Sequence, residues 1–400
     1  MFDLDVVVIG GGIAGSSVGI FLLKAGYKVT VYERAEKILP VGAAISVWSN
    51  GVKVMNRLGL GKEMVRLGGK MDYMTYRTSK DEPLVKMALD AVYKDVGERA
   101  YPVARGELQQ LLLDTFVKEG GKLVLGKTCV GVELEGELPR AVFDDGTKSH
   151  TADMMIAADG LNSVLRKHVL QRETEIKYKY TNWNGLIPMS PEIGDPTEWI
   201  MFVGDGKRAS LMPVAGNKFY FFMGCPLPEG SSAPPRGEAM RDELKELFKG
   251  WPKQVQALIN AIDVNNSLNR IPICDHDPLP KYSRGRVVLI GDSAHSTTPT
   301  LGQGGCQAME DAEVLSSFLS TTNISIEDAF DRYAQHRKDR VHSMVLKARE
   351  RTQTIYPTNA EDMKLTQAWY EDLKNNKEAG DNILKGITAN LKQGPWPPRL

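Results

Sequence analysis

A glycine-rich segment near the N-terminus constrains the fold of this chain more than any other feature. An apolar, β-branched run over residues 6–9 leads directly into the motif Gly10-x-Gly12-x-x-Gly15. The residues after the motif have the apolar spacing of a buried helix, and a second strand-like run ends just before Glu33. The order strand, glycine loop, helix, strand predicts a βαβ unit at the start of a parallel sheet.

This arrangement is typical of dinucleotide-binding folds, because each part has a physical role. The glycines permit a tight turn, let the backbone approach a pyrophosphate, and let the helix pack closely on the sheet. The N-terminus of the helix adds partial positive charge. Glu33 follows the motif by about 20 residues and offers a carboxylate to ribose hydroxyls. The alternative is a tight turn that binds nothing, and the motif alone does not distinguish FAD from NAD.

Composition excludes several classes of protein. The chain has 400 residues, 42% of them hydrophobic and 25% charged, which is enough for a large core shared by two domains. Lys plus Arg and Asp plus Glu both number 50, and there is no basic stripe, so we expect no nucleic-acid partner. The basic runs at 337–340 and 347–351 are interpreted as solvated helix faces.

Cysteine usage and hydropathy bear on the compartment. The cysteines form no CxxC pair, so we predict no metal site and no disulfide framework; they are Cys129, Cys225, Cys274 and Cys306. The N-terminal apolar stretch is interrupted by glycines, which argues against a signal peptide. No uninterrupted apolar run reaches membrane-spanning length. We therefore expect a cytoplasmic protein with reduced thiols and no membrane partner.

The pattern of apolar residues changes along the chain and indicates a discontinuous domain. Two stretches show alternating, aromatic-rich patterns typical of an antiparallel layer, and a strand of the first kind returns near residues 286–290. We predict a nucleotide-binding domain, an inserted substrate-binding sheet domain and a C-terminal helical segment that serves as a cover or an interface. The nucleotide-binding domain comprises residues 1–70, 100–176 and 272–325. The substrate-binding domain comprises residues 71–99 and 177–271, and the C-terminal segment comprises residues 326–400.

Three later segments identify a family. They read DMMIAADGLNSVLR from residue 153, RGRVVLIGDSAH from residue 284 and PTLGQGGCQAME from residue 299. With the first motif, they resemble the aromatic-hydroxylase family of flavoprotein monooxygenases. The resemblance implies an α/β fold like that of para-hydroxybenzoate hydroxylase: a Rossmann-type FAD-binding domain, an inserted, mainly antiparallel β-sheet substrate domain and a C-terminal helical segment.

The resemblance also implies how FAD is held. Asp292 would contact the ribitol and pyrophosphate, Asp159 the FAD and the nicotinamide, and Arg105 the flavin side. Backbone N–H groups of 302–306 would face the flavin ring carbonyl and stabilise the anionic reduced flavin; the alternative is a glycine-rich helix entry used only for packing. The predicted cofactor-binding residues are Gly10, Gly12, Ala14, Gly15, Glu33, Arg34, Ser46, Arg105, Val130, Asp159, Asp292, Gly302, Gln303, Gly304, Gly305 and Cys306.

Two further features near these motifs limit the interpretation. A second glycine pair, Gly59-x-Gly61, lacks a preceding strand and is interpreted as the turn at a helix end. The resemblance therefore implies that NADH or NADPH binds transiently, without a Rossmann domain of its own. His295 lies beside the cofactor loop, but a lone histidine there is expected to support the loop, and we do not assign it to catalysis.

Other segments resemble one branch, the FAD-dependent urate hydroxylases. They include NWNGLIP from residue 182, FVGDGKRASLMPV from residue 202 and GQGGCQAMEDA from residue 302. The resemblance implies that Asn182, Arg208 and Tyr220 bind substrate, with Arg208 and Tyr220 as the catalytic residues. Thr300 departs from the acidic residue that close urate-hydroxylating relatives tend to carry.

The chemistry agrees with this assignment. Urate is a planar anion near neutral pH, so a planar guanidinium is a suitable partner. Residues 208–213 and 218–223 predict a hairpin that could bring Arg208 and Tyr220 to one face. Without the resemblance, Arg208 would be interpreted as a surface cation and Tyr220 as a core aromatic residue.

The resemblance implies a reaction in purine degradation. NAD(P)H would reduce FAD, O₂ would form a flavin hydroperoxide, and urate would be hydroxylated to 5-hydroxyisourate with water as the second product. One alternative is the hydroxylation of a benzoate-type aromatic acid such as salicylate or hydroxybenzoate, with Arg208 binding a carboxylate. Another is a non-catalytic FAD-binding protein. The small-molecule substrate and O₂ are the expected partners, and a homo-oligomer is compatible with the sequence.

Overall fold

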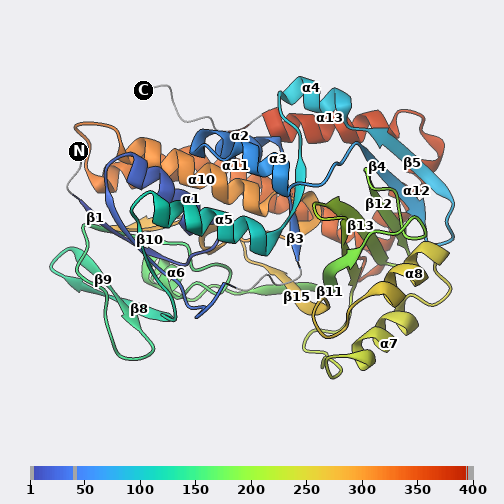
Figure 1. The fold of residues 1–400 in the computed structure, drawn as a ribbon, viewed down its shortest axis with the longest axis horizontal. Coiled ribbons are helices and arrows are strands. Elements are labelled where there is room, and N and C mark those ends of the chain that lie inside the picture. Colours follow the sequence, from blue (N-terminus) through green and yellow to red (C-terminus); the bar gives the residue numbers. More distant parts are fainter. Residues whose placement is uncertain (1–3, 39–42, 393, 395–400) are drawn as a thin grey trace.

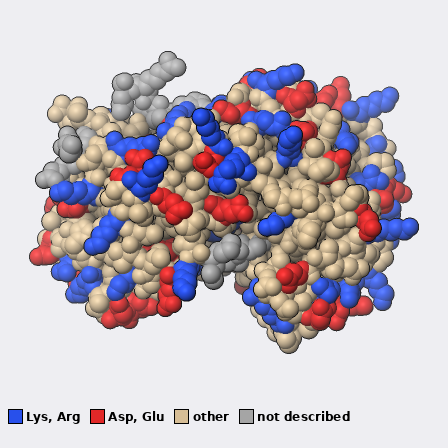
Figure 2. Space-filling model, in the orientation of Figure 1, with Lys and Arg blue, Asp and Glu red and all other residues tan. Residues whose placement is uncertain are grey.

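The computed structural model describes residues 4–38, 43–392 and 394. Small parts of two predicted segments, 1–70 and 326–400, therefore lie outside the described residues. The elements form two parts side by side, each built on its own sheet, with long helices running across both (Figure 1). None of the described helices combines the length and the apolar character that a bilayer crossing requires. Figure 2 shows both signs of charge interspersed over the visible face, without a patch of one sign.

The N-terminal βαβ unit is part of a six-stranded sheet. β1 pairs in parallel with both β2 and β10, and β10 pairs in parallel with β17. The central strands are short, apolar and buried on both faces, as expected for a parallel sheet covered by helices. The strand order is β16 (Ser283–Arg284), β17 (Val287–Leu289), β10 (Met154–Ala157), β1 (Asp5–Ile9), β2 (Lys28–Tyr32) and β7 (Lys122–Val124).

Helices from distant parts of the chain cover this sheet. α1 packs against both α10 and α5 (Figure 1). The contact of α1 with α5 is close because Gly19 has no side chain: a Cβ there would lie 2.8 Å from the ring of Phe116. The helices of this part are α1 (Ile13–Lys24), α2 (Ser49–Leu58), α3 (Gly61–Leu67), α5 (Arg105–Lys118), α6 (Val164–Leu170), α9 (Asp292–His295), the 3₁₀ turn η1 (Pro299–Leu301) and α10 (Gly304–Leu319).

Two small antiparallel strand pairs complete the first part. β3 (Ala44–Val47) pairs with β6 (Tyr101–Ala104), and β8 (Cys129–Glu135) pairs with β9 (Leu138–Phe143). The Gly59 pair ends α2, where Gly59 adopts a φ of +85°, so the predicted helix-end turn is confirmed.

The second part is a seven-stranded sheet in which only β12 and β4 pair in parallel. One of its faces packs on α7 (Glu238–Leu247) and α8 (Lys253–Ala261) around an apolar cluster that includes Trp183, Phe219 and Phe221. The strand order is β15 (Asn269–Asp275), β11 (Lys177–Pro188), β14 (Lys218–Cys225), β13 (Lys207–Val214), β12 (Glu198–Gly204), β4 (Tyr73–Thr78) and β5 (Pro83–Ala88). The strand membership supports the domain division that we predict from sequence, with β15 continuing beyond residue 271; the division stays a proposal.

The chain ends in long helices that connect the two parts. α11 (Ile326–Ile355) packs on α10 and η1 of the first part. Tyr356, which follows α11, stacks on Tyr180 of the seven-stranded sheet. α12 (Ala360–Asn375) and α13 (Ala379–Lys392) cover β5, and α13 also packs on α4 (Asp90–Val96) (Figure 1).

The interpretation of residues 337–340 as a solvated helix face is wrong. The side chain of Arg337 is 0% exposed and that of Arg340 is 8% exposed. These two side chains lie three residues apart on α11 and so face the same neighbour, α10, where Glu310 and Asp311 neutralise them. A run of basic residues looks solvated in sequence when its acidic partners lie on another helix.

The packing of α5 on α1 predicts a large cost for truncating Phe116. Replacing this fully buried ring by Ala would lower the free energy of unfolding by about 3–5 kcal/mol, because a cavity opens beside Gly19. Val117→Ala is the matched control, since Val117 is the next residue and is half exposed; it should cost less than about 0.5 kcal/mol. Chemical denaturation measures both, and similar costs would contradict the packing described.

Candidate active site

The three glycine-containing motifs come together in the structure. A Cβ on Gly10, which has a φ of +103°, would lie 2.3 Å from the carbonyl oxygen of Ala158, and one on Gly15 would lie 1.9 Å from that of Gly10. A Cβ on Gly291 would lie 2.9 Å from the Cβ of Ala14. Because each contact is closer than a side chain permits, glycine is required for these segments to share one site.

Polar contacts hold the same segments in place. The Ser293 hydroxyl donates to the Ala157 carbonyl at 2.6 Å, and the Arg166 guanidinium donates to the Ser293 carbonyl at 3.2 Å. From α5, the Gln109 amide donates to the carbonyl of Gly11 at 2.9 Å. Arg166 and Gln109 therefore tie α6 and α5 to the loops after β17 and β1.

The first glycine loop is suited to binding an anion. Gly12 caps α1 without any side-chain hydrogen bond, and a Cβ on Gly12 would meet nothing within 4 Å. The first-turn N–H groups of α1 thus lack a side-chain cap, and the space beside Gly12 leaves room for the approach of a pyrophosphate. The Glu33 carboxylate accepts from the N–H groups of Gly11 at 2.7 Å and Ala35 at 2.9 Å. Glu33 thus braces this loop and retains lone pairs for a ribose.

Asp159 contributes an unsatisfied acceptor to the same site. Its Oδ2 accepts from the N–H of Val164 at 3.0 Å, whereas its Oδ1 is inaccessible to solvent and has no hydrogen-bond partner. Burial raises the pKa of Asp159. Asp292 is exposed at the start of α9, and burial lowers the pKa of Arg166 while Asp159 and Asp292 oppose that change. Two carboxylates thus flank one guanidinium, and the free Oδ1 is matched to a donor such as a ribitol hydroxyl.

The loop before α10 presents a second set of backbone donors. Gly302 has a φ of +64°, and a Cβ there would lie 2.8 Å from Nε1 of Trp48, a buried donor without a hydrogen-bond partner. α10 begins at Gly304 without a side-chain cap, so its first N–H groups remain free for a ligand. A Cβ on Gly305 would lie 3.3 Å from Ile45, so little space remains beside the backbone there.

The other predicted cofactor residues fall into two groups. Ser46 and Cys306 are buried: the Ser46 hydroxyl lies 3.2 Å from the Met212 sulfur, and the Cys306 thiol accepts from the Trp48 N–H. Burial raises the pKa of Cys306 to about 12, so this thiol is neutral and packs. The side chains of three further residues are exposed at the ends of β2, β8 and α5: Arg34, Val130 and Arg105. Their roles toward FAD stay predictions.

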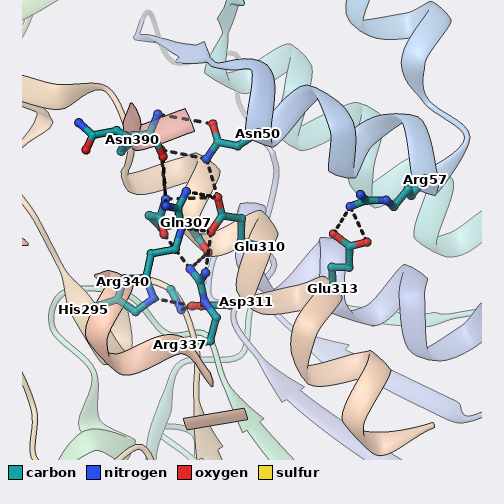
Figure 3. Close-up of polar contacts among 12 residues, drawn as sticks. Asn50, Arg57, His295, Gln307, Glu310, Asp311, Glu313, Arg337, Arg340 and Asn390 are labelled. Atoms are coloured by element: carbon teal, nitrogen blue, oxygen red, sulfur yellow. Dashed lines mark hydrogen bonds and ion pairs between the residues drawn. The ribbon is translucent and has the colours of Figure 1, made fainter. Parts of the chain in front are cut away.

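A buried ion-pair cluster lies directly behind these loops, and sequence reasoning missed it (Figure 3). It comprises Glu310 and Asp311 on α10 and Arg337 and Arg340 on α11. Arg337 donates to Asp311 at 2.6 Å and also to Glu310. Arg340 donates to both carboxylate oxygens of Glu310 at 2.8 Å. Two adjacent acidic residues in an otherwise apolar helix were the available signal, because buried carboxylates need partners.

The ion-pair cluster reaches the cofactor loops through side chains on both sides. Asp311 accepts from the N–H of Gly291 at 2.8 Å and from Nε2 of His295. Glu310 accepts from Asn50 at 2.7 Å, and Asn50 also donates to Gln303 at 2.9 Å. His295 therefore supports the loop, as expected from sequence. Gln303, predicted to bind cofactor, has its side chain committed to this network.

Electrostatics keep the cluster charged. Burial by itself would raise the pKa of Asp311, but His295 and Arg337 lower it to about 2. Burial likewise opposes ionisation of Glu310, and Arg337 and Arg340 overcome it, so the pKa of Glu310 is lowered. Because both pKa values are depressed, the stability they confer is present above the ordinary carboxyl pKa and is lost as the pH falls toward the native values.

The opposite side of the site is the second face of the seven-stranded sheet. In register, Asn182 of β11 and Arg208 of β13 both lie opposite Gly224 of β14. Met212, four residues along β13, lies opposite Tyr220. Since residues directly across a sheet point to one face, Asn182, Arg208 and Tyr220 share a face. The predicted hairpin of β13 and β14 is thus confirmed, and Asn182 reaches the same face from the neighbouring strand β11.

Arg208 is an unusual residue on this face. Its side chain is buried, its Nε has no hydrogen-bond partner, and within residues 4–38 and 43–392 no carboxylate pairs with it. The guanidinium carbon lies 4.6 Å from the Phe222 ring centroid and 5.6 Å from that of Tyr356. A cation held between aromatic rings without an acidic partner is suited to an anionic ligand.

Aromatic contacts connect Arg208 to the loop before α10. The Tyr220 ring lies 5.5 Å from Phe222, Phe222 lies 6.4 Å from Trp199, and Trp199 lies 6.4 Å from Trp48, beside Gly302. Burial raises the pKa of Tyr220, opposed by Arg208 and by Arg105 of the cofactor side. A chain of aromatic side chains therefore runs from the buried guanidinium of Arg208 to the loop that presents N–H donors.

Thr300, the residue that departs from the family pattern, contacts α11. Its hydroxyl donates to the Ala348 carbonyl at 2.7 Å and lies near the hydroxyls of Thr298 and Thr352. Thr300 therefore fastens the loop to α11.

A hollow of about 340 Å³ lies at the other end of α10, lined by residues such as Leu319 and Ala329, and takes no part in the site.

Comparisons with known proteins agree with this geometry. Residues 3–348 match the family model of the FAD binding domain. The chain is 41% identical over 399 residues, covering 99% of this chain and 98% of the relative, to a FAD-dependent urate hydroxylase from Mycolicibacterium vanbaalenii. A FAD-dependent urate hydroxylase from Klebsiella pneumoniae is also 41% identical, over 98% of this chain and all of that protein.

A solved structure gives the same result. Klebsiella pneumoniae HpxO complexed with FAD and uric acid superposes with a TM-score of 0.91 at 40% identity, covering 98% of this chain and 97% of that chain. The predicted fold class is therefore confirmed.

The ion-pair cluster yields a prediction with an internal control. Glu310→Gln leaves Arg337 and Arg340 without full compensation, so it should lower the free energy of unfolding by about 3–5 kcal/mol and weaken FAD binding. Glu313→Gln, one turn along α10, breaks only the pair with Arg57, which is 41% exposed; it should cost less than about 1 kcal/mol. Denaturant titration and flavin titration measure both, and equal losses would contradict the assigned role.

Proposed function

This chain belongs to the FAD-dependent urate hydroxylase family of flavoprotein monooxygenases, and from that premise we propose that it uses FAD, a reduced nicotinamide and O₂ to hydroxylate urate to 5-hydroxyisourate. The relatives that match over nearly their whole length carry this activity in their names, and one solved relative is complexed with uric acid. The arrangement of the site supports the same assignment residue by residue.

The residues present fit FAD. The N-terminus of α1 behind Gly12 would hold the pyrophosphate, Glu33 a ribose, and the free oxygen of Asp159 together with Asp292 the ribitol. The N–H groups that start α10 would face the flavin ring, where they favour negative charge. FAD supplies the redox and oxygen chemistry when bound.

The assignment of the substrate rests on the buried guanidinium of Arg208, with which no carboxylate in the described part of the chain pairs. Burying a cation without an anion costs several kcal/mol, so a ligand that brings the negative charge recovers that cost. Urate is anionic and planar, and fits between aromatic rings. The amides of Asn182 and Asn184, 3.2 Å apart, offer donors and acceptors to the edge of a heterocycle.

The roles of the chain's own residues follow from these positions. Arg208 favours the anionic form of urate, lowers the pKa of its ring N–H and makes the ring a better nucleophile. Tyr220 lines the same face with a neutral phenol, since burial raises its pKa. The rings of Phe222 and Tyr356 keep water away from Arg208.

The remaining expectations are part of the same proposal. NADH or NADPH would bind transiently, and the domain boundaries would follow the two sheets. We propose a cytoplasmic location, which is supported by unpaired thiols on all four cysteines: Cys129, Cys225, Cys274 and Cys306. A homo-oligomer is compatible with this function.

The proposal is tested with purified, flavin-loaded protein. Urate should accelerate NADH oxidation in the presence of O₂, with little H₂O₂, because hydroxylation then consumes the oxygen. Stimulation by salicylate or hydroxybenzoate but not by urate would instead identify a benzoate-type hydroxylase. A yellow protein that no aromatic substrate stimulates would be a non-catalytic FAD-binding protein, and a colourless one that takes up no flavin would refute FAD binding.

Arg208→Met provides the residue-level prediction. Removing the buried partner of an anionic substrate should lower kcat/KM for urate by at least about 30-fold, equivalent to about 2 kcal/mol, with FAD affinity unchanged. Lys207→Met is the matched control, since the neighbouring Lys207 points to the other face and donates to the Leu247 carbonyl. Steady-state kinetics with urate measure both variants, and an unaltered kcat/KM in Arg208→Met would reject the proposed role.

A further inference from the structure

Gly224 is the penultimate residue of β14 and lies on the substrate face of the seven-stranded sheet. It lies between Asn182 and Arg208 in the sheet. A Cβ built on Gly224 would lie 2.2 Å from the hydroxyl oxygen of Tyr356 and 2.5 Å from its Cζ. The tip of Tyr356 therefore occupies the space that a side chain at position 224 would need.

Tyr356 reaches this face from outside the sheet. It caps the C-terminus of α11, where its N–H donates to the Thr352 carbonyl at 2.8 Å. Its ring is buried and stacks on Tyr180 of β11, with centroids 3.9 Å apart and planes 24° apart. The side chain is thus fixed on two sides, by Gly224 beneath its tip and by Tyr180 along its face.

The third neighbour of Tyr356 is the guanidinium of Arg208. The guanidinium carbon lies 5.6 Å from the Tyr356 centroid and 4.6 Å from the Phe222 centroid. Burial raises the pKa of Tyr356, and Arg208 opposes this. Among the residues that the structure describes, no carboxylate pairs with Arg208, so its contacts with these two rings help to hold the cation in place.

The anchoring of α11 relates Tyr356 to the cofactor side. The carbonyl of Ala348 accepts from Thr298 and Thr300, in the loop before α10, and the Thr352 hydroxyl donates to Thr298 at 2.8 Å. One turn of helix therefore separates the loop contacts from Tyr356. The position of its ring is set relative to that loop as well as to the sheet.

We propose that Tyr356 is the positioning residue for Arg208, and that glycine at position 224 leaves the room that the ring of Tyr356 requires. The pair determines the acceptance of flat, anionic heteroaromatic substrates by fixing where the guanidinium stands. This inference rests on the proposed function of the site. It predicts that disturbing the pair raises KM for urate more than it lowers kcat, while FAD binding is unaffected, since neither residue touches the glycine loops.

A double-mutant cycle tests the pair. Gly224→Ala places a methyl group against the Tyr356 ring and should raise KM for urate at least about 10-fold. Tyr356→Leu removes the ring and should give a similar rise. The double variant should be no worse than Tyr356→Leu alone, because the methyl group then meets no hydroxyl or ring tip. Tyr356→Phe keeps the ring over the guanidinium and should restore KM to within about 3-fold of wild type.

The controls separate positioning from packing. Gly386→Ala, on α13, adds a methyl group that meets nothing within 4 Å and should change neither KM nor flavin affinity. Multiplicative losses in the double variant, or losses of FAD affinity that parallel the change in KM, would overturn the proposal. Should Gly224→Ala fail to fold, Tyr356→Leu against Tyr356→Phe decides, because an equal KM in the two would refute a role for the ring.

The test also distinguishes this inference from the proposed function. A wild-type protein that urate does not stimulate would refute the function. A wild-type protein that urate stimulates, with variants of unchanged KM, would refute only the positioning role. The urate-induced change in the flavin absorption spectrum gives a second readout, and its midpoint should shift with KM across the four variants.

Discussion

The site depends on one electrostatic arrangement, the pairing of Glu310 and Asp311 with Arg337 and Arg340. Two carboxylates in the interior of a helix would be costly without partners, and two guanidiniums from α11 compensate them. The same carboxylates accept from Gly291 and Asn50. The loops that form the cofactor side are therefore ordered by charges lying behind them.

On the substrate face, in contrast, a buried charge is not paired with an opposite charge in the part of the chain that the structure describes. There Arg208 is buried against aromatic rings, and no carboxylate of the described residues pairs with it. One side of the site thus satisfies its charges internally, while the other leaves a charge for a ligand to satisfy. α11 connects the two sides, since its Arg337 belongs to the ion-pair cluster and Tyr356, which follows the same helix, contacts Arg208.

Local pattern was enough to predict much of this structure. The glycine motif, the hairpin carrying Arg208 and Tyr220 and the supporting role of His295 all depend on neighbours in sequence or on a family resemblance. The ion-pair cluster and Tyr356 could not be predicted in this way. Arg337 and Tyr356 find their partners across the fold, and the significance of Gly224 is visible only once another element fills its missing side chain.

The register of the six-stranded sheet has a consequence for how the protein is made. β1 pairs with β10, which in turn pairs with β17, so Val6 is aligned with Met154 and Met155 with Val287. A nascent chain cannot complete this parallel sheet until β17 has left the ribosome, by which time every strand of the other sheet has already emerged. The dinucleotide site needs the loop that follows β17, so this site is accordingly completed only after most of the chain has been synthesised.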